Sequence, residues 1–255
     1  MISVVILGAG NVANHLFKAF NHAENIEVRQ WYNRHLQAID YHKNIVEVTD
    51  DVKSLRDADV YIIAISDDAI ANFSSQLPFE NKFVVHTSGT IGLNDLDKKN
   101  KRGVFYPLQT FSKEAEIDFS DVPICIETAD KTCLNLLKQL AEEIGSKSYR
   151  VNSEQRSSLH LAAVFVNNFN NHLYRIAHEI TESTSTDFNI LKPLILETAK
   201  KVQTLSPYLA QTGPAKRNDK KTIKKHLKKL ESSPHKAIYE LLTASIQRTH
   251  GRKKL

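Results

Sequence analysis

The sequence ISVVILGAGNVANHLFKAFN at residues 2–21 joins an apolar, strand-like run to a glycine-rich turn and a helix-like segment. The turn contains Gly8, Gly10 and the small residue Ala13. In a dinucleotide-binding turn, the first glycine permits the tight bend and the second lets the backbone approach a pyrophosphate. The third small residue lets the helix pack closely on the strand, and amides at the helix start face the phosphates. The expected pyrophosphate contacts are Gly8, Gly10, Asn11 and Val12.

A second strand is predicted at residues 26–32 and is followed by Asn33 and Arg34. Enzymes that bind NAD place an acidic residue roughly 20 residues after the turn, where it binds the ribose 2′-hydroxyl. A carboxylate would repel a 2′-phosphate, whereas a guanidinium can bind one through two hydrogen bonds. The sequence therefore predicts NADP(H) as cofactor, with Asn33 and Arg34 beside the ribose. The alternative is that Arg34 is an ordinary solvent-exposed loop residue.

The overall composition is that of a globular protein with 255 residues, 41% of them hydrophobic and 25% charged. No apolar run is long enough to span a bilayer, and no charged leader precedes the first strand. We therefore expect a soluble, cytoplasmic protein without a membrane segment. The two cysteines, Cys125 and Cys133, form neither a disulfide framework nor a metal-ligand pattern, so we expect both to be buried and expect no metal site.

Strand-like and helix-like segments alternate through the first 152 residues. Helices are predicted at residues 67–77 and 131–143, because apolar residues recur there at helical spacing. This alternation predicts an α/β fold with a doubly wound, mostly parallel sheet of Rossmann type. The other expected strands are residues 45–48, 60–65, 83–86, 103–106, 122–127 and 147–151.

From residue 153 no further β-branched run appears and the helical period persists. We therefore predict two domains, a cofactor-binding domain at residues 1–152 and an all-helical domain at residues 153–255. Within the second, residues 186–205 are predicted to form one helix, followed by a loop that contains two prolines and a glycine and then by two more helices.

The net charge of +5 is concentrated in the last part of the chain, where Lys and Arg residues between Lys216 and Lys254 far outnumber Asp and Glu. Such a segment could attract nucleic acid. However, Ile223, Leu227 and Leu230 fall at helical spacing between the lysines, as in an ordinary surface helix. No nucleic-acid motif accompanies the charge, so the surface-helix interpretation is preferred.

Ligands of open α/β sheets collect where the strands end, so the residues directly after each strand are candidates for the site. His86 is the candidate proton donor or orienting group, because imidazole titrates near neutral pH. The alternative is a histidine that ends a strand and is bonded locally. Ser66 and Ser88 are expected beside the cofactor, and Tyr106 is expected to donate a hydrogen bond to substrate or to serve the fold. Asp67 is interpreted as a helix N-cap.

The helix that begins near Ser153 separates into an apolar face and an unusual polar face that carries histidines and amides. His160 and Asn167 lie on the polar face. Solvent exposure is the default explanation for such a face, and orientation toward a cleft is the alternative. Asn offers both a donor and an acceptor, which suits it to a carboxamide or a substrate carbonyl.

Several longer motifs give the chain a family resemblance that covers essentially its whole length. It resembles the uncharacterised two-domain, Rossmann-like NADP oxidoreductases with a helical C-terminal domain of unknown function, which are similar in plan to pyrroline-5-carboxylate reductase, prephenate dehydrogenase and relatives of 6-phosphogluconate dehydrogenase. The motifs are GAGNVA at 8–13, NR at 33–34, SDD at 66–68, HTSG at 86–89, YPLQTF at 106–111, LHLAA at 159–163 with NN at 167–168, and TGPAKRND at 212–219.

This resemblance implies a Rossmann domain, a helical domain that commonly forms a homodimer, and a substrate cleft between them. It implies functional roles for His160, Asn167 and Asn168, and it marks the 212–219 loop, with Arg217 available to clamp a carboxylate, as a cleft or dimer element. Two positions depart from the family pattern. The family often has His where this chain has Tyr106, and Gly where it has Asn218.

Two functional hypotheses follow. The preferred one is an NADP(H)-dependent oxidoreductase that transfers a hydride to or from a small polar metabolite, with His86, His160 and Asn167 as the catalytic group. The competing one is a sensor or regulatory module that binds NADP(H) without turnover, because no unmistakable acid/base pair such as Tyr-x-x-x-Lys is present. A nucleic-acid binder that uses the basic segment ranks below both.

Overall fold

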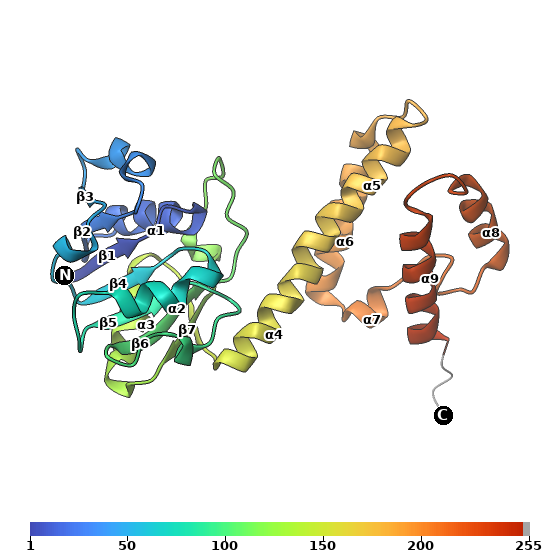
Figure 1. The fold of residues 1–255 in the computed structure, drawn as a ribbon. Coiled ribbons are helices and arrows are strands. Elements are labelled where there is room, and N and C mark those ends of the chain that lie inside the picture. The colour runs from blue at the N-terminus through green and yellow to red at the C-terminus, as the bar shows by residue number, and fades with distance from the viewer. Residues whose placement is uncertain (252–255) are drawn as a thin grey trace. The chain divides into compact units, whose positions relative to one another are not determined.

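The computed structural model describes residues 1–251 and divides into two compact units, Met1–Phe169 and the segment from Asn170 onward (Figure 1). The first unit contains the whole sheet. The boundary predicted at residue 152 coincides with the N-cap of helix α4, Asn152, whereas the division by compactness falls 17 residues later, inside a continuous helical segment.

The sheet has eight strands in the order β3-β2-β1-β4-β5-β6-β7-β8. All neighbouring strands are parallel except β6 and β7, which pair antiparallel. The order reverses between β1 and β4, which is the point where doubly wound sheets bind ligands. The strands are β1 Ile2–Leu7, β2 Ile26–Tyr32, β3 Glu47–Thr49, β4 Val60–Ile63, β5 Phe83–His86, β6 Lys101–Pro107, β7 Ile124–Thr128 and β8 Ser148–Arg150.

Helices cover both faces of this sheet (Figure 1). Alternate side chains of β1 point to opposite faces: Val4 and Ile6 pack with α1 (Asn11–His22) and α3 (Leu134–Glu143), whereas Val5 and Leu7 pack on the side of α2 (Asp67–Gln76). Because both faces are covered, the central strands are mainly apolar, with Ser3 in β1 and His86 in β5 as buried polar residues. The predicted α/β, doubly wound fold is confirmed.

The helical part begins with α4 and continues through a π-helix into α5 without a break. Its helices are α4 Ser153–Ala163, the π-helix Val164–Phe169, α5 Asn170–Glu182, α6 Lys192–Thr204, α7 Pro207–Ala210, α8 Lys220–Lys229 and α9 Lys236–His250. The short 3₁₀ turns are Leu36–Ala38, Asp40–His42, Val52–Ser54, Leu93–Asp95, Phe119–Asp121, Lys131–Cys133 and Phe188–Leu191.

The prediction of one helix over residues 186–205 was wrong. A 3₁₀ turn at Phe188–Leu191 precedes α6, which starts at Lys192 with Pro193 in its first turn. Proline lacks the amide that a helix interior requires, but it is well suited to the first turn, where that amide has no partner anyway. The loop predicted after this helix also contains the short helix α7.

Cys125 and Cys133 are both buried and unpaired, as expected. Within residues 1–251, no helix is long and apolar enough to cross a membrane.

Candidate functional site

The glycine-rich turn after β1 is held by contacts that only glycine permits at its first position. Gly8 has a φ of 121°, and a Cβ there would lie 2.2 Å from the carbonyl oxygen of Ala64, which follows β4. The buried indole of Trp31 donates a 2.6 Å hydrogen bond to the Gly8 carbonyl. A side chain at Gly8 would therefore push β1 and β4 apart at the point where the strand order reverses.

Gly10 serves a different purpose, because a Cβ there would meet nothing within 4 Å. The first hydrogen bond of α1 at this turn runs from the Asn14 amide to the Gly10 carbonyl. The amides of Asn11 and Val12 precede it and have no acceptor within the helix. Open space above a glycine, bounded by free amides at a helix N-terminus, fits a pyrophosphate.

The turn opens into a cleft of about 860 Å³ that belongs entirely to the first unit. This volume lies in the range of small-molecule and cofactor sites. The cleft is bounded by residues that follow β1, β2, β4, β5 and β6. Among the predicted site residues, those that line it are Gly8, Gly10, Asn11, Val12, Asn33, Arg34, Ser66, Ser88, Tyr106 and His160.

One end of the cleft carries the positive charge expected for a 2′-phosphate. Arg34 is exposed, lines the cleft, and makes no hydrogen bond or ion pair with any described residue. Asn33 shapes the loop: its amide bonds the Thr49 carbonyl at 3.0 Å and its side chain bonds the His35 carbonyl at 2.9 Å. His35 also lines the cleft beside Arg34 and was not singled out from the sequence, although its position next to Asn33-Arg34 was a usable signal.

The turn after β5 is cross-linked by side-chain hydrogen bonds. Ser88 Oγ accepts the amides of Thr90 at 3.1 Å and Ile91 at 3.0 Å. Thr90 Oγ1 in turn donates to Asp67 Oδ2 at 2.6 Å. Asp67 is the first residue of α2, and its N-cap is Ser66, so the interpretation of Asp67 as the N-cap was wrong by one residue. These bonds fix the turn against the start of α2.

His86 is not a cleft residue. Its side chain is fully buried, Nδ1 accepts the Ser88 amide at 3.1 Å, and Nε2 has no partner among the described residues. Burial, reinforced by the charge of Arg156, lowers the pKa of His86 to about 4. A neutral imidazole behind the turn cannot reach a ligand in the cleft. The geometry therefore disfavours the proton-donor role expected for His86 and favours the alternative, a locally bonded histidine that ends a strand.

At the other end of the cleft, α4 brings a polar side chain to the end of β6. His160 Nδ1 lies 3.1 Å from Tyr106 Oη. Farther along, the side chain of Asn167 donates a hydrogen bond to Thr110 Oγ1, although Asn167 itself does not line the cleft. The start of the polar helix face therefore bonds to β6 and to the loop that follows it. Default solvent exposure was the wrong interpretation for His160.

The apolar face of the same helix is largely exposed, contrary to what its composition suggests. Phe165 and Val166 are 61% and 73% exposed, and Phe169 is 50% exposed. Of the apolar residues on this face in α5, Ile176 is buried and Ile180 is exposed.

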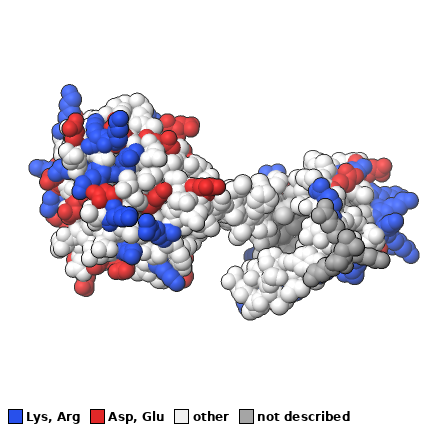
Figure 2. Space-filling view, turned by 90° about the horizontal axis from the view of Figure 1, so that it is seen from below, with Lys and Arg blue, Asp and Glu red and all other residues white. Residues whose placement is uncertain are grey.

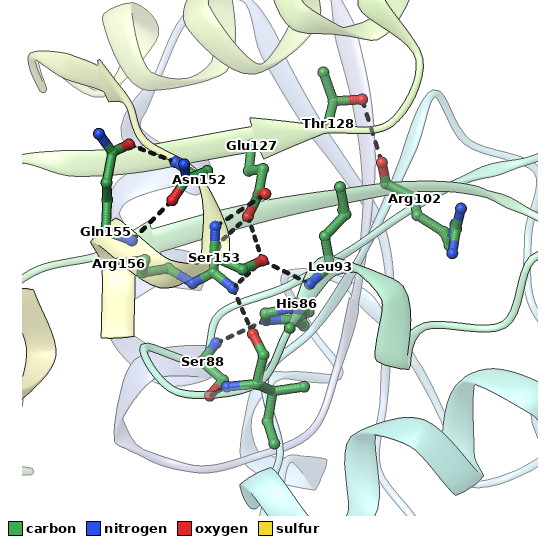
Figure 3. A network of polar contacts seen from close by, with 12 residues as sticks. His86, Ser88, Leu93, Arg102, Glu127, Thr128, Asn152, Ser153, Gln155 and Arg156 are labelled. Carbon is green, nitrogen blue, oxygen red and sulfur yellow. Dashed lines mark hydrogen bonds and ion pairs between the residues drawn. The ribbon is translucent and has the colours of Figure 1, made fainter. Parts of the chain in front are cut away.

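A buried ion pair anchors α4 to the sheet (Figure 3). The guanidinium of Arg156, 1% exposed, contacts the carboxylate of Glu127 on β7 and the carbonyl of Ile91. Ser153 Oγ donates to the same carboxylate at 2.8 Å and accepts the amide of Leu93 at 3.0 Å. Since His160 lies one helical turn after Arg156, this network helps to fix the position of the His160 side chain.

The network was missed at the sequence level. Arg156 stands four residues before His160 on the same helix face, which was the only local signal. Its partner Glu127 is 29 positions earlier in the chain, and nothing in the spacing of the two residues indicates that they pair.

The remaining predicted residues lie elsewhere. Arg217 is exposed in the second unit and lies in the loop before α8, where Asn218 has a positive φ of 53°. In α8 the lysines are exposed, while Ile223 and Leu227 are half-buried, as in a surface helix. Lys and Arg gather at the α8 end of the second unit, whereas charges of both signs are mixed over the first (Figure 2). Arg252, Lys253 and Lys254 lie outside the described residues. Within residues 1–251, no group of His, Cys, Asp or Glu is arranged to hold a metal ion.

Comparison with known proteins supports the same fold. Residues 122–246 match the family described as "Domain of unknown function (DUF2520)". No curated protein matches the chain. A crystal structure named "putative NADP oxidoreductase", from Bacteroides fragilis, is 39% identical over 98% of both chains, with a TM-score of 0.86.

Two more distant structures share the fold. Pyrroline-5-carboxylate reductase from Streptococcus pyogenes is 12% identical, covering 98% of this chain and 99% of that one, with a TM-score of 0.63. Prephenate dehydrogenase from Aquifex aeolicus is 16% identical, covering 97% and 99%, with a TM-score of 0.57. By their names, these two structures are a reductase and a dehydrogenase. The chain carries the DUF2520 domain and belongs to the same family as the Bacteroides fragilis protein.

Proposed function

We propose that the protein is an NADP(H)-dependent oxidoreductase that acts on a small polar metabolite. The observation that carries this proposal is the pairing of two features in one cleft. Open space over Gly10 adjoins the Asn11 and Val12 amides at the start of α1. Arg34, whose guanidinium has no partner among the described residues, lies where the second strand ends. The membership of the Bacteroides fragilis relative in the same family supports the oxidoreductase class.

The preference for NADP(H) over NAD(H) rests on charge. Arg34 and His35 line the ribose end of the cleft. The one carboxylate among the described lining residues is Asp67, which follows β4 at the start of α2 and accepts a hydrogen bond from Thr90. A 2′-phosphate would therefore meet a guanidinium and no opposing carboxylate at the loop after β2.

The test is calorimetric titration of the wild type and of Arg34→Asp with NADPH and with NADH. A hydrogen bond to a charged group contributes about 1.5–3 kcal/mol, so the variant should bind NADPH about 10- to 150-fold more weakly. Its affinity for NADH should change far less, because NADH lacks the 2′-phosphate. Arg150→Asp, an exposed charge change on β8, is the matched control and should leave both affinities unaltered.

Equal losses for the two nucleotides in Arg34→Asp would overturn the assignment of NADP(H). A wild type that binds neither nucleotide would overturn the proposed function as a whole.

We also propose that the protein self-associates as a homodimer through its helical segment. Apolar side chains stand exposed on α6 and α9, including Leu194 at 62%, Leu196 at 55% and Leu241 at 65%. Large apolar side chains that are exposed in this way are typical of interaction sites on proteins. Sedimentation equilibrium should give a dimer for the wild type and a monomer for Leu194→Glu combined with Leu241→Glu. A monomeric wild type at micromolar concentration would contradict the proposal.

A further inference from the structure

A tyrosine and a histidine meet at one edge of the cleft, at the end of β6. Of the strands that border the cleft, β6 lies farthest in the sheet from β2, which Arg34 follows. Tyr106 lies near the end of β6 and His160 lies on α4. Their side chains approach edge to face, with ring centroids 6.1 Å apart, and Tyr106 Oη lies 3.1 Å from His160 Nδ1. Both residues line the cleft, so a ligand in the cleft can reach them.

The turn after β5 is shaped to admit this pair. A Cβ at Gly89 would lie 2.7 Å from His160 Nδ1 and 2.9 Å from Tyr106 Cζ. Any side chain at Gly89 would therefore separate the two rings or push them out of the cleft. The bare backbone at this position lets the pair pack directly against the turn that Ser88 and Asp67 fix in place.

The position of the pair is also fixed from the helix side. Arg156, one turn before His160, is anchored to Glu127 of β7. Asn167, two turns after His160, is bonded to Thr110 in the loop that follows β6. Such support from both directions is what a group that transfers a proton at a defined point requires.

The two side chains differ in how they hold a proton. Burial raises the pKa of Tyr106 to about 12, so its hydroxyl stays protonated near neutral pH and can act as an uncharged donor. Imidazole is the side chain that exchanges protons readily in this range. A hydroxyl that is backed by an imidazole can give up its proton and recover one without becoming a free phenolate.

We propose that Tyr106 and His160 together form the proton donor of this site, and that the group reduced is a carbonyl, with the corresponding alcohol as product. This inference rests on the proposed function, because NADPH, when bound, would supply the hydride to the carbonyl carbon.

The proton transfers follow from the contacts. As the C=O double bond becomes a single bond, Tyr106 Oη gives its proton to the carbonyl oxygen. As His160 Nδ1 returns a proton to Tyr106 Oη, the other ring nitrogen of His160 takes up a proton from solvent. The product has gained one hydride and one proton, and the pair holds as many protons as before. Oxidation of an alcohol follows the same path in reverse.

The pair favours a carbonyl over an iminium as the reacting group. An iminium already carries its proton and its positive charge, so hydride addition gives an amine without a proton from the protein. The single carboxylate among the described lining residues, Asp67, is engaged by Thr90. The cleft of the first unit therefore offers a proton donor for a neutral oxygen and no free carboxylate for a cation.

The experiment uses the full chain with NADPH as the probe. NADPH binding is measured by fluorescence titration for the wild type, Tyr106→Phe and His160→Ala. NADPH oxidation is then followed with a panel of small ketones, aldehydes and 2-oxo acids and with a matched panel of cyclic imines. Tyr149→Phe and His172→Gln, at exposed positions, are the matched controls. Circular dichroism confirms that each variant is folded.

The proposal predicts turnover of carbonyl compounds. Tyr106→Phe and His160→Ala should each lower kcat by about 10²- to 10⁴-fold while NADPH affinity changes less than about threefold. Added imidazole should restore part of the activity of His160→Ala and none of that of Tyr106→Phe, an outcome that a merely structural role would not give.

Three results would overturn the proposal. They are carbonyl turnover that both variants retain, turnover of imines alone, and NADPH binding by the wild type without oxidation by any carbonyl compound of the panel. Failure of the wild type to bind NADPH is a different result, because it would remove the proposed function itself.

Discussion

Replacing each of the two glycines of the turn by alanine should produce opposite effects on stability and binding. At Gly10 the backbone angles are φ −72° and ψ 179°, which alanine adopts freely, and the added Cβ meets nothing within 4 Å. A glycine-to-alanine change at such a position alters the free energy of unfolding by less than about 1 kcal/mol, and in the stabilising direction. The Gly10→Ala variant should therefore fold as well as the wild type.

The same methyl group would occupy the space into which a pyrophosphate must come to reach the Asn11 and Val12 amides. Each charge-assisted hydrogen bond that is lost costs about 1.5–3 kcal/mol, so loss of one weakens binding about 10- to 150-fold. Loss of both would abolish binding at practical concentrations.

Gly8→Ala should instead damage the fold. Its φ of 121° is unfavourable for any residue with a Cβ, and that atom would lie 2.2 Å from the Ala64 carbonyl oxygen. Backbone strain alone costs about 1–3 kcal/mol, and the displaced strand ends add to it.

Urea unfolding measures both effects through the single tryptophan, Trp31, which is buried and bonded to the Gly8 carbonyl. NADPH titration of the folded variants supplies the binding constants. Binding of NADPH by Gly10→Ala with wild-type affinity would refute the assignment of the turn as the pyrophosphate site.

Two further predictions concern the buried network. Burial and the charge of Arg156 lower the pKa of His86 to about 4, so the stability that the neutral His86 ring contributes is complete above pH 6.5 and is lost as the pH falls toward 4. In urea unfolding, the wild type should lose on the order of 3 kcal/mol relative to His86→Gln over this interval. Parallel pH curves for the two proteins would contradict this expectation. Arg156→Met leaves the Glu127 carboxylate without its buried partner and should lower the free energy of unfolding by on the order of 3–5 kcal/mol. Adding Glu127→Leu in a double variant should restore part of this loss. If the losses of the two single variants simply add, the two side chains are not coupled.

The sequence predicted best those elements that local spacing determines. The bounds of β2 and β5 agree with the prediction to the residue. β5 is a short apolar run that a turn follows, whereas β2 mixes apolar and polar residues and ends before the polar pair Asn33-Arg34. The third strand was placed at 45–48 but lies at Glu47–Thr49. Ile45 was counted as a strand residue because it is apolar, yet it is 59% exposed and precedes the strand.

Most of the residues that line the cleft could be predicted from the sequence, because a glycine turn and the residues after parallel strands come together by topology. The side-chain contacts around His86 and His160 could not. His86 ends a strand like a ligand-binding residue, but it lies in the middle of a sheet covered on both faces, and only the packing shows that its ring is enclosed. The contact of Tyr106 with His160 depends on how α4 is anchored, which in turn depends on the long-range pairing of Arg156 with Glu127.

A crystal structure of the protein with NADP⁺ bound tests the central claim most directly. The account predicts pyrophosphate oxygens within hydrogen-bond distance of the Asn11 and Val12 amides, the 2′-phosphate on the Arg34 guanidinium, and the nicotinamide ring beside Tyr106 and His160. A dinucleotide that leaves the glycine turn empty, or whose nicotinamide lies away from the Tyr106–His160 pair, would contradict it.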